Sequence, residues 1–245
     1  METDIVVTTR NRLDYTKQCL TYIFERTRSP YNLHIIDDAS TDGTVDYLLD
    51  LWHSGKVETV ILASKKRGLR ANQNMELSLT FSDPYISVDN DILCPDVEPD
   101  WLARGLKAIR QRSHLGLMGL HLPETPPEYR WKSDGVVCIA KSLGGHFAFI
   151  RRAAIAGYFA PHVKGMPVKA GKKTPYPGTG RCQWLQNHGW HTGFLIDTYC
   201  SHIGEVSARK EVKGKVYVMR PMDEKTLETT ERQARVADRK RKGKR

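Results

Sequence analysis

Short apolar runs alternate with amphipathic stretches through the first hundred residues of the chain. The apolar runs are rich in β-branched residues and predict buried strands, at residues 4–9, 32–38, 57–64 and 85–91. The stretches between them carry apolar residues at helical spacing and predict helices, at residues 15–27, 40–53 and 68–81. Asp14 is a suitable N-cap for the first of these helices. Strands and helices that alternate at this spacing indicate βαβ units, and therefore a mostly parallel sheet flanked by helices.

The second half of the chain has a less regular pattern. It predicts a helix, a strand, a strand pair with a short helix, and a final strand, at residues 99–112, 115–122, 136–159 and 193–205. Residues 160–181 are rich in Gly, Pro and Lys and contain no acid, so we interpret them as a long basic loop of the kind that often covers a site. We expect an α/β fold, with one domain over residues 1–222 divided near residue 98, and a basic tail at 223–245.

Composition and charge narrow the class of protein. No run of about 18 apolar residues is present and the N-terminus lacks a signal-peptide pattern, so we expect no transmembrane segment and a cytoplasmic location. The five cysteines are scattered without CxxC spacing, which favours reduced thiols and argues against a zinc site. The net charge of +10 is concentrated in the last 14 residues, where eight Lys or Arg stand against one Asp. Such a tail indicates either a solvated end or a tether to a polyanion.

Polar side chains follow three of the predicted strands at the points where the strands end. They are Thr8 and Thr9, the acidic pair at 37–38, and Asp89 with Asp91 in the stretch ISVDND. Ligands of open parallel sheets bind beyond the carboxyl ends of the strands, so these side chains are expected to meet at one rim. Two carboxylates one residue apart are typical of a turn, but they are also the ligands that Mg²⁺ and Mn²⁺ prefer.

Several segments together resemble family 2 of the nucleotide-sugar glycosyltransferases, which have the Rossmann-like GT-A fold. IVVTTRNR resembles the opening strand and turn of that family, and IIDDASTDGTVDYL resembles its most specific segment. RGLRANQN resembles the start of its third helix, VDND its DxD motif, and GGHFAFIRRAAIAGYF its acceptor-side segment. The resemblance covers residues 4–205 and is weaker after residue 160.

The resemblance implies a donor site for a nucleotide-sugar, usually a UDP-sugar in this family. The residues that it assigns to the donor are Thr8, Thr9, Arg10, Asp38, Arg67, Arg70, Asp89 and Asn90. Asp38 would accept a hydrogen bond from the base, and the two arginines at 67 and 70 would meet the diphosphate. Mn²⁺ or Mg²⁺ would be held by Asp91 and Asp89, joined by His202 near the end of a late strand, and would neutralise charge on the departing nucleotide.

The usual catalytic base of the family is absent from its expected place. Inverting members carry an acidic pair there, but this chain has Pro177 and Gly178. An inverting transfer needs a base for the acceptor hydroxyl, and Asp134 is the preferred substitute, with Glu128, Glu124 and His146 as alternatives. A retaining route that needs no such base is a second explanation, and a binding protein that has lost catalysis is a third.

The acceptor side of the predicted site is basic and aromatic. Its candidate residues are Gly144, Gly145, His146, Lys172, Lys173 and Trp184. Lysines in the predicted loop, together with Arg181, predict an anionic acceptor. The leading hypothesis is a hydroxymethylated base in DNA, as in virus-type DNA modification in a host cytoplasm, where the base must leave the duplex. The first alternative is an envelope-glycan or lipid-linked acceptor at an anionic membrane surface. The second is a nucleic-acid-binding protein with a vestigial transferase fold.

Overall fold

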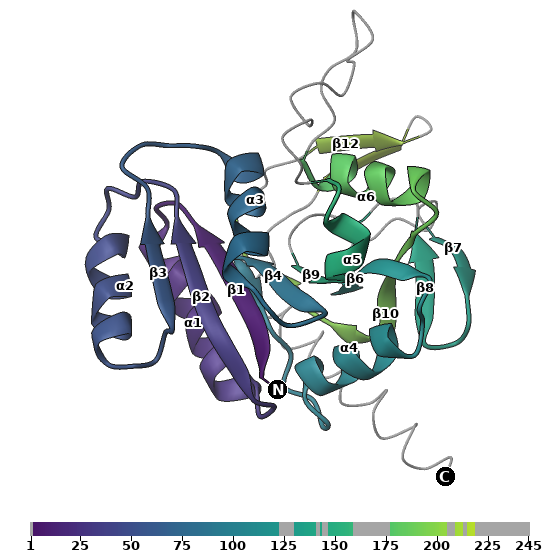
Figure 1. Cartoon of the computed structure of the whole chain (residues 1–245), viewed down its shortest axis with the longest axis horizontal. Helices are drawn as coiled ribbons and strands as arrows, with labels where there is room; N and C mark the ends of the chain where they lie inside the picture. Colours follow the sequence, from purple (N-terminus) through teal and green to yellow (C-terminus); the bar gives the residue numbers. More distant parts are fainter. Residues whose placement is uncertain are drawn as a thin grey trace, which may run out of the picture.

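The structure is a computed structural model of the chain. It describes residues 2–122, 130–140, 143, 147–158, 177–204, 209–212 and 215–218, and all structural statements below refer to these residues. Their main feature is one mixed sheet with strand order β3-β2-β1-β4-β9-β6-β10-β8-β7 (Figure 1). Two small two-stranded sheets, β5 with β11 and β12 with β13, accompany it.

The first half of the chain builds the parallel part of the sheet. Its strands are β1 (Thr3–Thr9), β2 (Tyr31–Asp37), β3 (Thr59–Leu62) and β4 (Tyr85–Asp89). They alternate with α1 (Leu13–Arg26), α2 (Thr44–His53) and α3 (Leu69–Leu79). The registers pair Thr8 of β1 with Ile36 of β2 and with Asp89 of β4, so the carboxyl ends of the three strands lie level. The predicted βαβ units are therefore confirmed.

The second half extends the sheet in mixed orientation. Its strands are β6 (Leu115–His121), β7 (Arg130–Ser133), β8 (Val137–Ala140), β9 (Phe147–Ile150) and β10 (His191–Tyr199). Its helices are α4 (Trp101–Arg110), α5 (Arg152–Ile155) and α6 (Pro177–Asn187), and its short strands are β5 (Ile92–Leu93), β11 (Ser201–His202), β12 (Arg209–Val212) and β13 (Lys215–Val218). Strand β9 runs antiparallel to both β4 and β6 and thereby joins the two halves into one sheet.

Two hydrophobic clusters cover the opposite faces of the sheet. One contains the buried residues of α1, α2 and α4, with Trp101 packed edge-on against Phe147. The other contains the buried residues of α5 and α6, with Leu77 of α3 packed against it. The first cluster is tight at α4, because a Cβ on Gly105 would lie 1.9 Å from the ring of Phe149. The helices thus form a layer on each side of the sheet, as the alternating pattern predicted.

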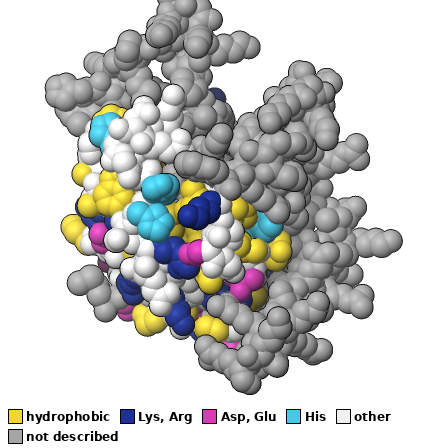
Figure 2. All heavy atoms as spheres, turned by 90° about the vertical axis from the view of Figure 1, so that its right-hand side faces the viewer, with side chains coloured by type: hydrophobic (Ala, Val, Ile, Leu, Met, Phe, Trp, Pro, Cys, Tyr) yellow, Lys and Arg dark blue, Asp and Glu magenta, His cyan; other side chains and the backbone are white. Residues whose placement is uncertain are grey.

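The side of the second half that faces the viewer in Figure 2 carries mixed charges. Among its described residues, basic, acidic and histidine side chains lie interspersed, without a patch of one sign. Arg112 forms an ion pair with Asp134 in this half of the chain. The rings of His114 and His191 lie 5.2 Å apart.

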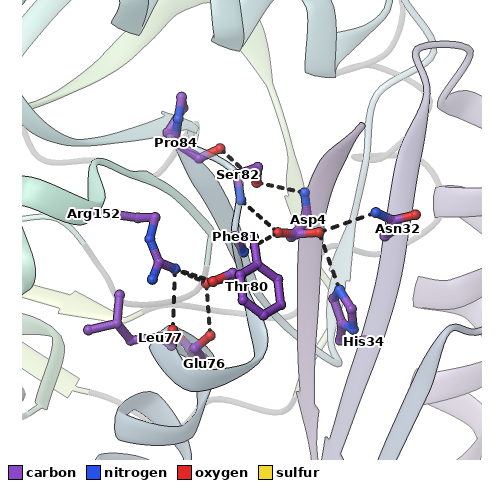
Figure 3. A network of polar contacts seen from close by, with 10 residues as sticks. All are labelled: Asp4, Asn32, His34, Glu76, Leu77, Thr80, Phe81, Ser82, Pro84 and Arg152. Atoms are coloured by element: carbon purple, nitrogen blue, oxygen red, sulfur yellow. Dashed lines mark hydrogen bonds and ion pairs between the residues drawn. The ribbon is translucent and has the colours of Figure 1, made fainter. Parts of the chain in front are cut away.

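The amino end of β1 is fixed by a network around the buried side chain of Asp4 (Figure 3). Asp4 Oδ2 accepts hydrogen bonds from the backbone N–H groups of Phe81 (2.5 Å) and Ser82 (2.8 Å), which follow α3. Asp4 Oδ1 lies 3.4 Å from both Asn32 Nδ2 and His34 Nε2 on β2. One carboxylate therefore joins β1, β2 and the turn before β4.

The paired basic residues that follow β9 are structural. Arg152 donates to the carbonyl oxygens of Leu77 (3.2 Å) and Thr80 at the end of α3 (Figure 3). Arg151 donates to the carbonyl oxygens of Leu115 (3.1 Å) and Ile109 (2.9 Å). A cation at a helix C-terminus satisfies carbonyl groups that have no partner within the helix. Arg152 therefore ties the second half of the chain to α3, and Arg151 ties the residue after β9 to the end of α4.

Two predictions about local structure were wrong. The segment 160–181 was expected to be loop throughout, but α6 begins at Pro177, where a proline suits the first turn of a helix. Asp14 was expected to cap α1, but the cap residue is Arg12, in the left-handed region at φ 61° and ψ 50°, and Asp14 lies within the first turn.

Candidate functional site

A cavity of about 440 Å³ opens at the level carboxyl ends of β1, β2 and β4. Its walls are Thr8, Thr9, Arg10, Arg12, Asp38, Lys66, Leu69, Asn72, Asp89, Asn90, Asp91 and His202. Most of the residues predicted for donor and metal therefore line one cavity, at the place where ligands of such sheets bind.

Among the polar atoms buried in the wall, Oγ1 of Thr8, at the end of β1, and Oδ1 of Asn72, in the first turns of α3, have no hydrogen-bond partner among the described residues. A buried polar atom without a partner is unfavourable by roughly 1–3 kcal/mol, and a ligand with matching groups removes that penalty. The cavity thus presents a hydroxyl and an amide oxygen to a polar ligand.

Asn90, the third residue of the VDND stretch, lines the cavity and forms hydrogen bonds with residues of β1, α1 and the turn between them. Its Nδ2 lies 3.0 Å from Thr9 Oγ1 and 2.9 Å from Thr16 Oγ1, and 3.4 Å from the carbonyl oxygen of Asn11. Thr9 and Thr16 are themselves 3.0 Å apart through their hydroxyls. These contacts tie β4 to the turn between β1 and α1. The donor role predicted for Thr9 and Asn90 therefore competes with a positioning role.

Asp38 joins the end of β2 to the start of α3. Its two carboxylate oxygens accept hydrogen bonds from the backbone N–H groups of Arg67 (2.6 Å) and Gly68 (2.9 Å). Its own N–H donates to the carbonyl oxygen of Thr9 at 2.9 Å. Asp38 is almost fully buried yet lines the cavity, so it both shapes the wall and faces a ligand.

Asp91 and His202 meet because β5 pairs with β11. The register sets Ile92 opposite His202, and Ile203 N–H donates to the carbonyl oxygen of Asp91 at 2.9 Å. As a result, His202 Nε2 lies 3.4 Å from Asp91 Oδ2. Gly204 completes the corner, since a Cβ there would lie 2.1 Å from the same oxygen. Only a glycine allows the backbone to pass this close to the carboxylate.

Arg12 contacts the same carboxylate from the opposite end of the site. Its Nη1 lies 3.0 Å from Asp91 Oδ2, in a charge-assisted hydrogen bond. The Arg12 side chain is 41% exposed and that of Asp91 only 10%. Asp91 Oδ2 is therefore shared between a guanidinium and an imidazole.

The corner at Asp91 fits a divalent cation that a substrate helps to hold. No group of three or more His, Cys, Asp or Glu side chains is assembled for a metal within the described part of the chain. Mg²⁺ and Mn²⁺, however, are commonly bound by one or two carboxylates together with substrate phosphates. Asp91 and His202 are already in contact and Asp89 lines the same cavity, so these oxygen and nitrogen donors suit such an ion.

Asp134 does not lie with the other predicted residues. It is absent from the cavity wall and sits in the turn between β7 and β8, where its Oδ1 accepts from the N–H groups of Val136 and Val137. Its Oδ2 accepts from Nε of Arg112 at 2.6 Å. The hydrogen bond from Arg112 in particular holds the pKa of this carboxyl well below its usual range. A carboxylate that binds a proton so weakly is a poor general base.

The remaining predicted residues fall in three groups. Arg10 lines the cavity, whereas Arg67 does not, and the Arg67 guanidinium contacts Met75 Sδ on α3 instead. Trp184 stacks on His188, with ring centroids 3.7 Å apart, and packs against the second hydrophobic cluster. The Arg70 side chain and the residues Gly144, Gly145, His146, Lys172 and Lys173 lie outside the described part of the structure.

Sequence reasoning missed several residues. The wall includes Arg12, Lys66, Leu69 and Asn72, none of which was assigned a role. Asn72 stands in the RGLRANQN segment, and that motif was the available signal. Arg181, expected among the acceptor-binding residues of the loop, is instead buried in α6 with its Nη2 3.4 Å from Glu76 Oε2.

Comparisons with known proteins place this geometry in a family. A family model described as "Glycosyl transferase family 2" matches residues 4–159. No curated protein sequence matches the chain significantly. No helix among the described residues is long and apolar enough to cross a membrane.

Several solved structures share the fold at low sequence identity. One is the mannosyltransferase PcManGT from Pyrobaculum calidifontis, in complex with GDP-Man and Mn²⁺ (TM-score 0.63, 17% identity, covering 83% of this chain and 57% of that one). Another is GalNAc-T7 with UDP, GalNAc and Mn²⁺ (0.62, 13%, 96% and 48%). A third is S. aureus TarS 1–349 in complex with UDP-GlcNAc (0.59, 14%, 87% and 60%). The chain thus spans about half to three fifths of these proteins.

The mixed sheet, its two helical layers and the cavity at its carboxyl edge define a GT-A fold, which confirms the predicted α/β class. Because the family model matches well over half of the sequence, the chain belongs to glycosyl transferase family 2.

Proposed function

We propose that the protein is a metal-dependent glycosyltransferase that takes a sugar from a nucleotide-sugar, most simply a UDP-sugar. The observation that carries this proposal is the contact between Asp91 and His202 in a cavity whose wall also holds unpartnered polar atoms. Membership of family 2 supports it, and so do the similar structures solved with GDP-Man and Mn²⁺ or with UDP, GalNAc and Mn²⁺.

The donor half of the cavity has groups for the nucleoside and the diphosphate of a nucleotide-sugar. In the proposal, Asp38 and Thr8 bind the nucleoside, because one is a carboxylate and the other an unpartnered hydroxyl at neighbouring strand ends. Arg10 and Lys66 supply positive charge for the diphosphate. Asp91, Asp89 and His202 would hold Mn²⁺ or Mg²⁺. When bound, such an ion neutralises the charge that develops on the departing nucleotide.

The catalytic base is not part of this proposal. Among the described residues, the acids that line the cavity are Asp38, Asp89 and Asp91, and the proposal gives all of them donor-side roles. Glu124, Glu128 and His146, the alternatives to Asp134, lie outside the described residues and stay sequence-based predictions. The same holds for the choice between an inverting and a retaining reaction.

The acceptor is proposed to be anionic, and the support for this comes from the sequence. The lysines at 164, 169, 172 and 173 and the strongly basic tail lie outside the described residues. On this basis we propose a hydroxyl on nucleic acid, such as a hydroxymethylated base, whose phosphates would supply affinity without sequence reading. An envelope-glycan or lipid-linked acceptor is the competing outcome of the experiment.

Nucleotide release from donors tests the enzymatic proposal. The protein is incubated with UDP- and GDP-sugars, with Mn²⁺ or with EDTA, and free nucleotide is measured. We expect release to require the metal and to decrease at least about a hundredfold in Asp91→Asn. The matched control is Asp50→Asn, which removes an exposed acid of α2 away from the cavity. Failure of every nucleotide to bind would refute the proposal.

The acceptor is tested with labelled donor. Hydroxymethylated DNA, plain DNA and the glycan and lipid fractions of a bacterial lysate are offered in parallel. Label in hydroxymethylated DNA alone supports the nucleic-acid acceptor. Label confined to a glycan or lipid fraction leaves the transferase proposal intact but refutes this acceptor.

A further inference from the structure

The turn between β1 and α1 has an unusual backbone. Asn11 and Arg12, neither of them a glycine, both lie in the left-handed region, at φ 55° and 61°. Left-handed conformations are unfavourable for L-residues because the Cβ approaches the following carbonyl oxygen, and they normally occur singly. Two in succession persist only where surrounding contacts impose them, and such outliers often mark functional sites.

The contacts that impose this conformation come from the segment after β2. Asn11 N–H donates to Ser40 Oγ at 2.6 Å, and Asn11 Oδ1 accepts from Thr41 N–H at 2.8 Å. The first N–H of α1, on Leu13, donates to Asp42 Oδ2 at 3.1 Å. These interactions hold the backbone on both sides of Arg12, and none of them involves the Arg12 guanidinium. The guanidinium itself reaches Asp91.

Arg12 and His202 approach the same oxygen of Asp91. The distances to Asp91 Oδ2 are 3.0 Å from Arg12 Nη1 and 3.4 Å from His202 Nε2. A divalent cation held by Asp91 and His202 would lie close to this carboxylate, whose Oδ2 the Arg12 guanidinium already contacts. Two cations that contact the same carboxylate lie close together and repel each other strongly in a partly buried site. Arg12 and the metal are therefore competitors.

The Arg12 side chain has a second position open to it. It is 41% exposed and lines the donor cavity. A guanidinium binds the oxygens of a phosphate as readily as it binds those of a carboxylate. A nucleoside diphosphate in the cavity would offer such oxygens. Movement of Arg12 from Asp91 to the diphosphate would free the carboxylate for the metal at the moment when the metal has phosphates to bridge.

We propose that Arg12 is an internal counter-ion for Asp91, which keeps the metal site weak until a nucleoside diphosphate draws the guanidinium away. Arg12 thereby couples metal binding to nucleotide binding, and each ligand raises the affinity for the other by the same factor. This inference rests on the proposed function, since it takes Asp91 as a metal ligand. It adds a positioning residue that makes the binding of the two ligands cooperative.

The test is direct binding of Mn²⁺, with no turnover required. Free Mn²⁺ is measured by electron paramagnetic resonance while the ion is added to the protein, with and without UDP and, in a second arm, GDP. For the wild-type protein we expect weak binding of Mn²⁺ alone and an increase in affinity of about tenfold or more with the matching nucleotide. For Arg12→Met we expect Mn²⁺ alone to bind about tenfold more tightly and the nucleotide to add little.

Two further variants make the result specific. Lys66→Met removes a positive charge from the same cavity, but Lys66 shows no contact with Asp91, so its affinity for Mn²⁺ alone should match the wild type. Arg12→Lys keeps the positive charge but lacks the planar set of guanidinium donors, and it should restore part of the coupling between metal and nucleotide. Thermal unfolding of each variant establishes that it is folded.

The outcomes separate this inference from the proposed function. If Arg12→Met binds UDP or GDP but gains no affinity for Mn²⁺ alone and keeps the wild-type coupling, Arg12 is not the counter-ion and only this inference fails. Equal gains in Arg12→Met and Lys66→Met would also overturn it, because the effect would then be one of general charge. If folded wild-type protein binds neither nucleotide nor metal, the proposed function and the inference fail together.

Discussion

Glu76 and Arg181 form an ion pair that joins α3 to α6 over a separation of 105 residues. Glu76 Oε2 and Arg181 Nη2 lie 3.4 Å apart, and the two side chains are 1% and 2% exposed. Ser87 of β4 donates to the other oxygen of Glu76 at 2.9 Å. The two halves of the chain are therefore linked by charge as well as through β9. Burial raises the pKa of Glu76 to about 7, although the charge of Arg181 opposes the shift.

This raised pKa predicts how stability depends on pH. The folded protein keeps a proton on Glu76 up to about pH 7, whereas the unfolded chain releases it near 4.5. The stabilisation of the folded protein by protonated Glu76 is therefore fully present below about pH 4.5 and is lost as the pH rises through 7. It amounts to something on the order of 3 kcal/mol. Urea unfolding of Glu76→Gln between pH 5 and 8 should show a weaker decrease than the wild type, while Asp50→Asn should keep the full decrease.

Removal of the partner gives a second, independent prediction. In Arg181→Met the carboxylate of Glu76 would be buried without its cation, so the free energy of unfolding should fall by about 3–5 kcal/mol at pH 8. At pH 5 the carboxyl is protonated and the loss should be smaller. Urea midpoints at the two pH values measure the difference. An equal loss at both would show that the charge of Glu76 is not involved.

Gly204→Ala tests the corner at Asp91. The added Cβ would fall 2.1 Å from Asp91 Oδ2, so the carboxylate or the backbone of residues 202–204 must shift. We expect the affinity for Mn²⁺ in the presence of UDP to decrease at least about tenfold and stability to decrease by about 1–3 kcal/mol. Gly180→Ala is the control, since its Cβ would make an ordinary 3.5 Å contact with the Tyr158 hydroxyl. Equal metal affinities in both variants would contradict the role given to Gly204.

Asp38→Asn tests whether the Asp38 carboxylate contributes to nucleotide binding as well as to stability. An asparagine can accept at one oxygen only, and its NH₂ group would face the N–H of Arg67 or Gly68. We expect nucleotide binding, measured by calorimetry, to weaken about tenfold or more and stability to decrease by about 1–3 kcal/mol. Asp100→Asn is the matched control. Asp100 is also buried and accepts hydrogen bonds from the backbone N–H groups of Arg28 and Ala103 outside the cavity wall, so its replacement should lower stability and leave nucleotide affinity unchanged.

Asp4 predicts sensitivity to acid at the other end of the sheet. Its burial by itself would raise the pKa, but the hydrogen bonds from Ser82 and Phe81 prevail and lower it. The stabilisation is therefore present above the ordinary pKa of 3.8 and is lost as the pH falls through the lower, folded value. Asp4→Asn should be less stable than the wild type at pH 6, and the gap should narrow in acid. Asp14→Asn, at an exposed position on α1, should show no such gap.

The sequence was informative where local pattern and tertiary structure agree. The β-branched runs became β1 to β4, and the polar residues after them met at one cavity because parallel strands share their carboxyl edge. The pairing of Asp91 with His202 was expected from the family resemblance, since no local pattern relates residues 111 positions apart.

The sequence failed where tertiary contacts override local preference. The helix α6 begins in PGTGR, which has no apolar period, and its Arg181 was grouped with the lysines of the predicted loop. Asp14 looked like a helix cap, but contacts from residues 40–42 impose the cap on Arg12. Asp134 precedes the predicted acceptor-side segment in the sequence, yet a tight turn and Arg112 hold it away from the cavity wall. In each case the position of the side chain depends on partners that are distant in the sequence, and local pattern does not reveal them.

The pairing of β5 with β11 has a consequence for how the site comes into being. The family model ends at residue 159, and the strand that delivers His202 to Asp91 lies beyond it. During synthesis, Asp91 emerges from the ribosome more than a hundred residues before the histidine that it contacts. A nascent chain that stops short of residue 204 can form the parallel strands β1 to β4 but not this corner. The strand ends that carry Thr8 and Asp38 can therefore be in place early in translation, whereas the proposed metal site is complete only once residue 202 has been added.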